Sequence, residues 1–371
     1  MVMMRPAFYI CCLTLFMSCE DFEGGHSATP YSEFSAPFNF GLFESPPNNP
    51  MTVEGIELGR KLFYETRLSR DATISCSSCH QQSKAFTDGK TVAIGIDDQK
   101  GDRSTMSLVN LLWSTQNMFW DGRAGSIEEQ VLQPIANPKE MDLPVDQAVA
   151  RLNDIRSYRD EFKIAFGARK IRKEHVAKAL AQFIRSLVSQ DSRYDKFLNG
   201  ELQLSDSELS GMQSFFTHPD PSVALRGSNC GDCHRNFLTD GFKDAYEGFA
   251  NNGIDDEDNL ENGLFGITGN PLDKGKFKVP TLRNIALTAP YMHDGRFETL
   301  EEILDHYNEH IRESTTLDLL ISSASNEPRK YDDPIGLKLT EAEKKNIIAF
   351  MHTLTDSTFI SNVNYANPFN D

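Results

Sequence analysis

The chain has 371 residues, of which 39% are hydrophobic and 25% are charged, and its formal net charge is −17. This length is sufficient for two domains of ordinary size, each with its own core. The acidic balance excludes nucleic acid as an expected partner, because a negative surface repels phosphate, and it favours basic partners.

The N-terminal residues predict an export signal. One positive charge, Arg5, precedes an apolar run from Ala7 to Met17 that is too short to span a bilayer as a mature helix. Residues 1–19 are therefore predicted to be a signal peptide of the lipoprotein type, with Cys19 lipidated. The alternatives are a plain signal peptide and an uncleaved anchor. We expect an exported protein in the periplasm or cell envelope that contacts the membrane only through its lipid.

Two CxxCH strings account for the remaining cysteines, CSSCH at 76–80 and CGDCH at 230–234. In such a string two thiols attach one haem covalently and the histidine ligates its iron. We therefore predict two haem c groups. The first is bound by Cys76, Cys79 and His80, and the second by Cys230, Cys233 and His234. A single zinc site built from the four cysteines is the alternative, but it explains neither histidine.

Helix signals between and after these strings predict a mainly α fold. Val176, Leu180, Phe183, Ile184 and Leu187 would form one apolar helix face. Capping boxes are formed by Ser205 with Glu208 and by Thr340 with Glu343. The expected division is a linker at 20–48, a haem domain at 49–200 and a second haem domain at 201–371.

An internal repeat predicts that these two cytochrome c-like domains arose by duplication. FWDGRAGSIEEQVLQP, from Phe119, matches MHDGRFETLEEILDHY, from Met292, with an offset of 173. Upstream, MSLVN at 106–110 matches PTLRN at 280–284. Each copy has a predicted capping box, Ser126 with Glu129 and Thr299 with Glu302. Because the glutamate pair recurs, Glu128 and Glu129 are assigned to capping and surface charge.

The two copies differ where an iron ligand would be needed. Gln130 and Pro134 correspond to Ile303 and Tyr307, and residues four apart share one helical face. Tyr307 can ligate an iron and Pro134 cannot. The second iron would then have all its coordination positions filled, whereas the first would keep one position vacant.

The sequence offers further candidate ligands for both irons. Met292 is the rival ligand of the second iron. Met106, Met118 and Met141 are conceivable ligands of the first, since no histidine occurs from residue 81 to 174. His306 and His310 are expected to face outward.

The chain resembles the bacterial dihaem cytochrome c peroxidases and their MauG-type relatives from about Asn49 to about Asp356. The resemblance is carried, in order, by LFYETRLSRDATISCSSCH, FTDG, FWDGRAGSIEEQ, PIANPKEM, CGDCH, FKVPTLRNIALTAPYMHDGR and TLEEILDHY. It implies that the N-terminal haem reacts with hydrogen peroxide and that the C-terminal haem passes electrons to it.

The resemblance also assigns roles to single residues. Trp120 would lie between the haems as a bridge, and Gln130 and Glu140 would line the peroxide pocket. Tyr307 matches the MauG-type pattern, in which a tyrosine ligates the second haem. A calcium ion between the haems is implied at Thr288 and Pro290, with Ser104 at a position that is usually asparagine.

The expected function is reduction of hydrogen peroxide to water with electrons from a small redox protein, such as cytochrome c or a copper protein. Two alternatives remain. The first is a MauG-type oxidase that modifies a protein or another organic substrate through a high-valent state. The second is an electron-transfer cytochrome without catalysis. Dimers are common among relatives, so a homodimer is one expectation.

Overall fold

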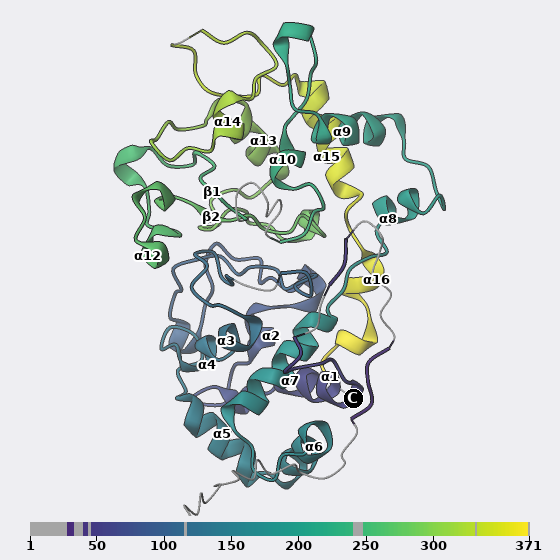
Figure 1. The fold of residues 1–371 in the computed structure, drawn as a ribbon, viewed down its shortest axis with the longest axis vertical. Coiled ribbons are helices and arrows are strands. Elements are labelled where there is room, and N and C mark those ends of the chain that lie inside the picture. Colours follow the sequence, from purple (N-terminus) through teal and green to yellow (C-terminus); the bar gives the residue numbers. More distant parts are fainter. Residues whose placement is uncertain are drawn as a thin grey trace, which may run out of the picture.

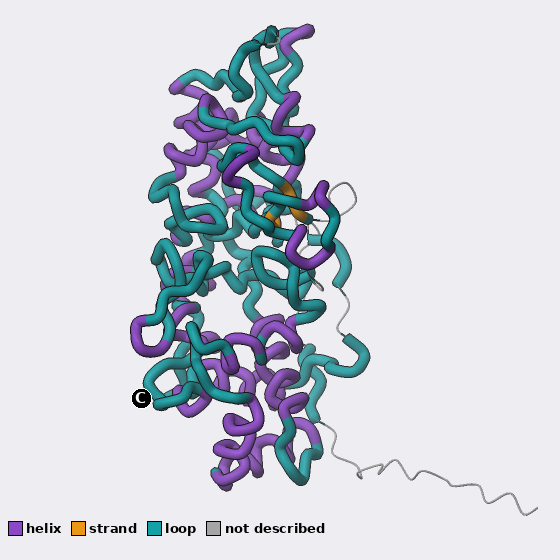
Figure 2. Tube along the Cα trace, turned by 90° about the vertical axis from the view of Figure 1, so that its left-hand side faces the viewer, coloured by secondary structure: helices purple, strands orange, loops and turns teal. Residues whose placement is uncertain are grey.

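The computed structural model describes residues 28–32, 40–43, 46–114, 117–239, 248–330 and 332–369. Within these residues the fold is mainly helical, with one small antiparallel sheet of β1 (Phe249–Ala250) and β2 (Phe277–Lys278). Figure 2 shows that long loops join short helices. The predicted signal peptide and Cys19 lie outside the described residues. None of the helices in the described part of the chain combines the length and the apolar character of a membrane span.

The helices of the N-terminal half are α1 (Val53–Phe63), α2 (Cys76–Cys79), α3 (Ile127–Gln130), α4 (Gln133–Ala136), α5 (Val145–Asp154), α6 (Arg156–Phe166), α7 (Lys173–Ser186) and α8 (Arg193–Leu198). Those of the C-terminal half are α9 (Asp206–Phe216), α10 (Cys230–Cys233), α12 (Phe265–Thr268), α13 (Leu300–Glu309), α14 (Leu319–Ser323), α15 (Glu341–His352) and α16 (Ser357–Ile360). Short 3₁₀ turns lie at 66–68, 82–84, 96–98, 221–223, 257–259, 271–273, 285–287 and 363–365.

The lower lobe in Figure 1 is built on the contact between α1 and α7. Glycine at position 59 permits this contact, because a Cβ there would lie 1.9 Å from the carbonyl oxygen of Ala179. The rings of Phe63 and Phe183 meet across the interface with centroids 5.2 Å apart. The apolar face predicted for 176–187 is confirmed, since α7 buries it in the core of this lobe.

The upper lobe repeats this construction with α9 and α15. Gly211 allows the close approach, because a Cβ there would lie 1.9 Å from the carbonyl oxygen of Asn346. Both predicted capping boxes form at the N-termini of these helices. Phe215 and Phe350 pack in a second apolar core with centroids 5.4 Å apart.

Residues related by the offset of 173 adopt similar backbone conformations. Phe119 and Met292 both have positive φ, 69° and 73°, and each follows an isolated bridge, Met118 with Ala124 or Tyr291 with Phe297. The helices that follow differ. In the second half α13 is continuous, whereas in the first half α3 ends at Gln130 and α4 starts at Gln133.

The end of the chain returns to the lower lobe. After α15 the backbone runs down past α16 to the C-terminal residues beside α1 (Figure 1). Phe359 of α16 is buried in the first core, and Tyr64 donates a hydrogen bond to the carbonyl of Tyr365 at 2.7 Å. Residues within the range predicted as the second domain therefore complete the core of the first lobe.

Candidate active site and second haem site

The CSSCH string forms α2 at the edge of a cavity in the lower lobe. The cavity has about 640 Å³ of unfilled space, part of it continuous with solvent. Its walls come from α1, α2, α7 and the segment from Gln130 to Met141. It is lined by Phe63, Ile74, Ser75, Cys76, Cys79, His80, Gly95, Leu108, Gln130, Val131, Pro134, Glu140, Met141, Leu180 and Ile184.

The imidazole of His80 lines the cavity and is held by a backbone carbonyl. Its Nδ1 lies 2.8 Å from the carbonyl oxygen of Phe86, and since that oxygen can only accept, Nδ1 donates. Burial lowers the pKa of His80, and the carbonyl of Phe86 partly opposes this effect. The neutral ring keeps Nε2 as a lone-pair donor, which is the form that ligates iron.

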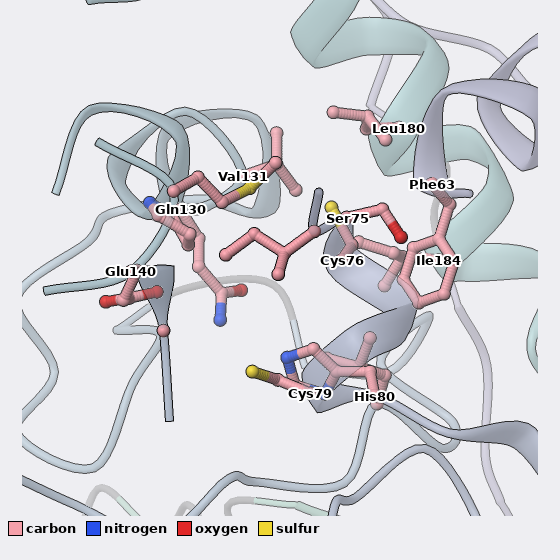
Figure 3. Close-up of a pocket in the computed structure, with 15 residues that line it drawn as sticks. Phe63, Ser75, Cys76, Cys79, His80, Gln130, Val131, Glu140, Leu180 and Ile184 are labelled. Carbon is pink, nitrogen blue, oxygen red and sulfur yellow. The ribbon is translucent and has the colours of Figure 1, made fainter. Parts of the chain in front are cut away.

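Gln130 and Glu140 lie across the cavity from the cysteines and His80 (Figure 3). The Oε1 atom of Gln130 is buried without a hydrogen-bond partner, and Oε1 of Glu140 accepts a bond of 2.7 Å from Asn137. Burial raises the pKa of Glu140, while Asn137 and the charge of Arg123 oppose the rise. This wall therefore offers a small polar ligand a carboxyl group with a raised pKa and an amide oxygen that has no hydrogen-bond partner.

Pro134 lines the same cavity as Gln130 although the helix is interrupted between them. The predicted common face is thus kept, and it offers the first site no ligating side chain at position 134. Of the three methionines considered, Met141 lines this cavity and Met106 and Met118 do not.

The CGDCH string forms α10 beside a second cavity, in the upper lobe. This cavity has about 770 Å³ of unfilled space, part of it continuous with solvent. Burial lowers the pKa of His234 to about 4, and its Nδ1 faces the carbonyl of Pro280 without forming a hydrogen bond of normal geometry. The cavity is lined by Trp120, Cys233, His234, Ala250, Asn252, Phe277, Lys278, Val279, Pro280, Leu282, Ile285, Tyr291, Met292, His293, Ile303, Tyr307 and Ile321.

Both candidate ligands of the second iron face this cavity and share one neighbour, Asn252. The amide Nδ2 of Asn252 lies 3.2 Å from Sδ of Met292 and 3.5 Å from the hydroxyl of Tyr307. Burial raises the pKa of Tyr307, and the hydrogen bond from Asn252 partly opposes the rise. The geometry brings Tyr307 and Met292 to the same place and does not choose between them.

Trp120 belongs to the N-terminal half of the chain but lies at the wall of the second cavity, in the C-terminal half. Its Nε1 donates to the carbonyl oxygen of Ser104 at 2.9 Å, and its own carbonyl accepts from the backbone of Lys278 at 2.8 Å. Its ring meets that of His293 edge to face with centroids 6.5 Å apart. Trp120 therefore connects the backbones of both halves.

The three residues of the predicted calcium site come together around one small cavity. Ser104, Thr288 and Pro290 line about 460 Å³ of unfilled space, part of it open to solvent, together with Trp120. The hydroxyl of Thr105, which also lines this cavity, is buried without a hydrogen-bond partner. The cavity therefore offers an oxygen that a cation or a water can satisfy.

The cysteines fit haem attachment better than zinc binding. Cys76 and Cys79 line the first cavity, whereas Cys233 lines the second, in the other lobe, so the four thiols do not meet at one site. Burial raises the pKa of Cys76 to about 12 and that of Cys230 to about 11. Each cavity has room beside its cysteines and a neutral histidine, as a covalent haem requires.

Two expectations about surface residues are wrong. His306 is only 3% exposed, and its Nε2 donates to the carbonyl of Asn252 at 3.0 Å, whereas His310 is exposed as expected. Glu128 is not a simple surface charge, because it forms two contacts of 2.7 Å with the guanidinium of Arg185. Both departures arise because a distant segment covers the side chain.

Sequence reasoning missed several residues that shape the two sites. Asn252 lies outside every motif, and only the fold places its amide beside Tyr307. His293 occupies the position of the repeat that corresponds to Trp120, and its ring stacks on Phe277 with centroids 3.6 Å apart. The motif MHDG was the one signal that could have indicated a structural role for this histidine.

Comparison with known proteins gives consistent matches. A family profile described as di-haem cytochrome c peroxidase matches residues 53–203. The methylamine utilization protein MauG of Methylorubrum extorquens is 33% identical over 312 residues, which is 83% of this chain and 80% of that protein. Cytochrome c551 peroxidase of Nitrosomonas europaea is 38% identical over 259 residues, 69% of this chain and 73% of that protein.

Among solved structures, the fold is similar to that of a MauG-like protein associated with microbial copper homeostasis. The TM-score is 0.78 at 35% sequence identity, and the alignment covers 91% of this chain and 99% of the other. This agreement extends over both lobes.

Proposed function

Because the chain belongs to the family of dihaem cytochrome c peroxidases and MauG proteins, we propose that it reduces hydrogen peroxide to water at the haem held by Cys76, Cys79 and His80. It is an oxidoreductase that uses peroxide, it carries two c-type haems, and a small redox protein is its partner. The observation that supports this assignment of sites is the asymmetry of the two cavities. Opposite His80 lie Gln130 and Glu140, and in the cavity of His234 lies Tyr307.

The residues of the first cavity have distinct tasks. A bound haem would supply a redox-active iron that can bind and reduce peroxide. His80 would hold this iron through Nε2, while the carbonyl of Phe86 fixes the ring. Across the cavity, the carboxylate of Glu140 would take a proton from one peroxide oxygen and return it to the other, and the amide of Gln130 would orient the peroxide. With two electrons and two protons, one peroxide gives two waters.

The second cavity serves electron entry in this proposal. Cys230, Cys233 and His234 would hold the second haem, and Tyr307 would be the second protein ligand of its iron, with Met292 as the weaker candidate. A phenolate oxygen favours ferric iron over ferrous iron more than a thioether does. Trp120, at the wall of the second cavity, would carry electrons toward the first haem.

Further features complete the proposal. The same positive φ values at Phe119 and Met292 support two tandem cytochrome c-like units from a duplication, at 49–200 and 201–371. One calcium ion is proposed at Ser104, Thr288 and Pro290, because these residues line one cavity in which the hydroxyl of Thr105 has no hydrogen-bond partner. We also propose that residues 1–19 direct export, that 20–48 form a linker and that Cys19 is lipidated, with a homodimer as a further expectation.

Spectra and turnover of the protein with both haems test this function. We expect peroxide consumption that depends on reduced cytochrome c, and an electron paramagnetic resonance spectrum with one high-spin and one low-spin ferric signal. Cyanide should convert the high-spin signal alone. Two low-spin signals that ignore cyanide and peroxide would instead identify a cytochrome without catalysis.

A MauG-type oxidase is the second candidate, because a tyrosine lies in the second cavity. This function predicts that peroxide is consumed without oxidation of cytochrome c while a protein or another organic substrate is modified. Mass analysis of such a substrate, after incubation with peroxide, separates the two candidates.

A further inference from the structure

The loop that follows the first haem-attachment string has an unusual backbone. Ala85 and Phe86 are consecutive residues with positive φ, 49° and 60°. Bulky L-residues rarely adopt this left-handed conformation, and it persists only where the surrounding structure holds it. Its consequence is local, because this conformation directs the carbonyl of Phe86 to Nδ1 of His80, 2.8 Å away.

Two aromatic rings contact the buried ring of Phe86. Phe63 of α1 lies at a centroid distance of 5.9 Å, and Phe359 of α16 lies at 5.7 Å. The loop has two further anchors. Ser107 donates to the carbonyl of Ala85 at 2.7 Å, and Gln82 donates to the carbonyl of Asn362 at 2.8 Å. One ring and one anchor therefore come from the last residues of the chain.

We call residues 356–366 the C-terminal strap. The strap starts at Asp356, whose Oδ1 accepts from the backbone of Phe359 at 3.0 Å and so caps α16. The other oxygen of Asp356 accepts from the hydroxyl of Ser189 and the backbone of Gln190, each at 3.0 Å. The backbone of Asp356 donates to the side chain of Asn284, in the second half, at 2.8 Å.

We propose that Phe359 is a positioning residue for His80. The ring of Phe359 holds Phe86 in its left-handed conformation. In this conformation the carbonyl of Phe86 accepts a hydrogen bond from Nδ1–H of His80. A hydrogen bond of this kind fixes the ring and increases the basicity of a ligating imidazole. The C-terminal strap therefore tunes the first iron from outside its cavity. This inference rests on the proposed function only in requiring a haem at His80.

The test is to replace Phe359 by leucine and to compare Phe162→Leu as a matched control. Phe162 is equally buried in the same core but lies on α6, and its ring neighbour is Phe166. The main measurement is the iron–histidine stretching frequency of the reduced first haem by resonance Raman spectroscopy. Redox titration of each haem is the second measurement, and neither requires turnover.

Phe359→Leu should lower the stretching frequency and raise the reduction potential of the first haem, because the imidazole becomes a weaker donor. The second haem should keep its potential, and Phe162→Leu should match the parent protein in both measurements. Equal frequencies in Phe359→Leu and the parent, or equal shifts in both variants, would overturn the proposal.

Gln82→Ala offers a second test that leaves the core intact. It removes the anchor to Asn362 and should shift the frequency in the same direction as Phe359→Leu but by less. If Phe359→Leu does not fold, an unshifted frequency in Gln82→Ala refutes the role of the C-terminal strap. A shifted frequency in a protein that fails to reduce peroxide would leave this inference standing and reject the proposed activity.

Discussion

Gly95 places Glu140 in the first cavity, and replacing this glycine by alanine tests the role of Glu140 without changing its chemistry. A Cβ at position 95 would lie 2.1 Å from the carbonyl oxygen of Lys139 and 2.6 Å from Cα of Glu140. The φ of Gly95 is −96°, so alanine introduces no left-handed strain and the effect is steric. Because real Cβ contacts are essentially never under 3.0 Å, the segment at 139–140 must move by about 1 Å.

A displacement of about 1 Å at a catalytic group can reduce the rate about 100-fold. We therefore expect Gly95→Ala to lower kcat for peroxide reduction about 100-fold, while both haems remain attached and the spin states are unchanged. The assay is steady-state oxidation of reduced cytochrome c by peroxide, with haem content measured in the same samples. Gly101→Ala is the matched control, because its Cβ would meet no heavy atom closer than 3.4 Å. A kcat for Gly95→Ala within a few fold of the parent value would refute this reasoning.

Three further predictions concern single side chains. Glu140→Gln should lower kcat by about 10²–10⁴-fold; since burial raises the pKa of Glu140, the parent rate should increase as pH rises through that pKa, and the variant should lack this increase. Tyr307→Phe should change the low-spin ferric signal of the second haem, and an unchanged spectrum would show that the tyrosine is not its ligand. Burial would raise the pKa of Asp356, but hydrogen bonds from Thr358 and from the backbone of Asp191 outweigh it and lower the pKa, so its ionised form stabilises the fold above the unfolded pKa. Asp356→Asn should therefore reduce the free energy of unfolding by about 1.5–3 kcal/mol at pH 7. Urea titrations should show that this difference between variant and parent becomes smaller below about pH 4. An equal difference at pH 7 and below about pH 4 would contradict this linkage.

The asymmetry between the two cavities links these experiments. The first cavity is lined by a carboxyl and an amide, whereas the second is lined by a phenol and a thioether. The backbone differs between the two sites as well, because the helix is interrupted between α3 and α4 in the first half, whereas α13 is continuous in the second half. Variants of Glu140 should therefore affect turnover, and variants of Tyr307 should affect spectra.

The amino-acid sequence alone predicts features that depend on neighbouring residues. A CxxCH string places two thiols and an imidazole within little more than one helical turn, so both attachment sites are local. The capping boxes at Ser205 and Thr340 formed as predicted, because each joins residues three apart. The repeat could also be read directly, since a duplicated segment keeps its pattern of side chains.

Tertiary structure decided which distant segments meet. The amide of Asn252 reaches Tyr307 across 55 residues of sequence, and the ring of Phe359 contacts that of Phe86 although the two residues are far apart in the chain. His306 was expected at the surface because its helix position gives no sign of the segment that covers it. Such contacts depend on how apolar faces pack around two cores, and an apolar pattern in the sequence predicts that a face is buried without identifying the segment that packs on it. The type of each candidate ligand can therefore be read from the local sequence, whereas its orientation depends on the packing of the whole chain.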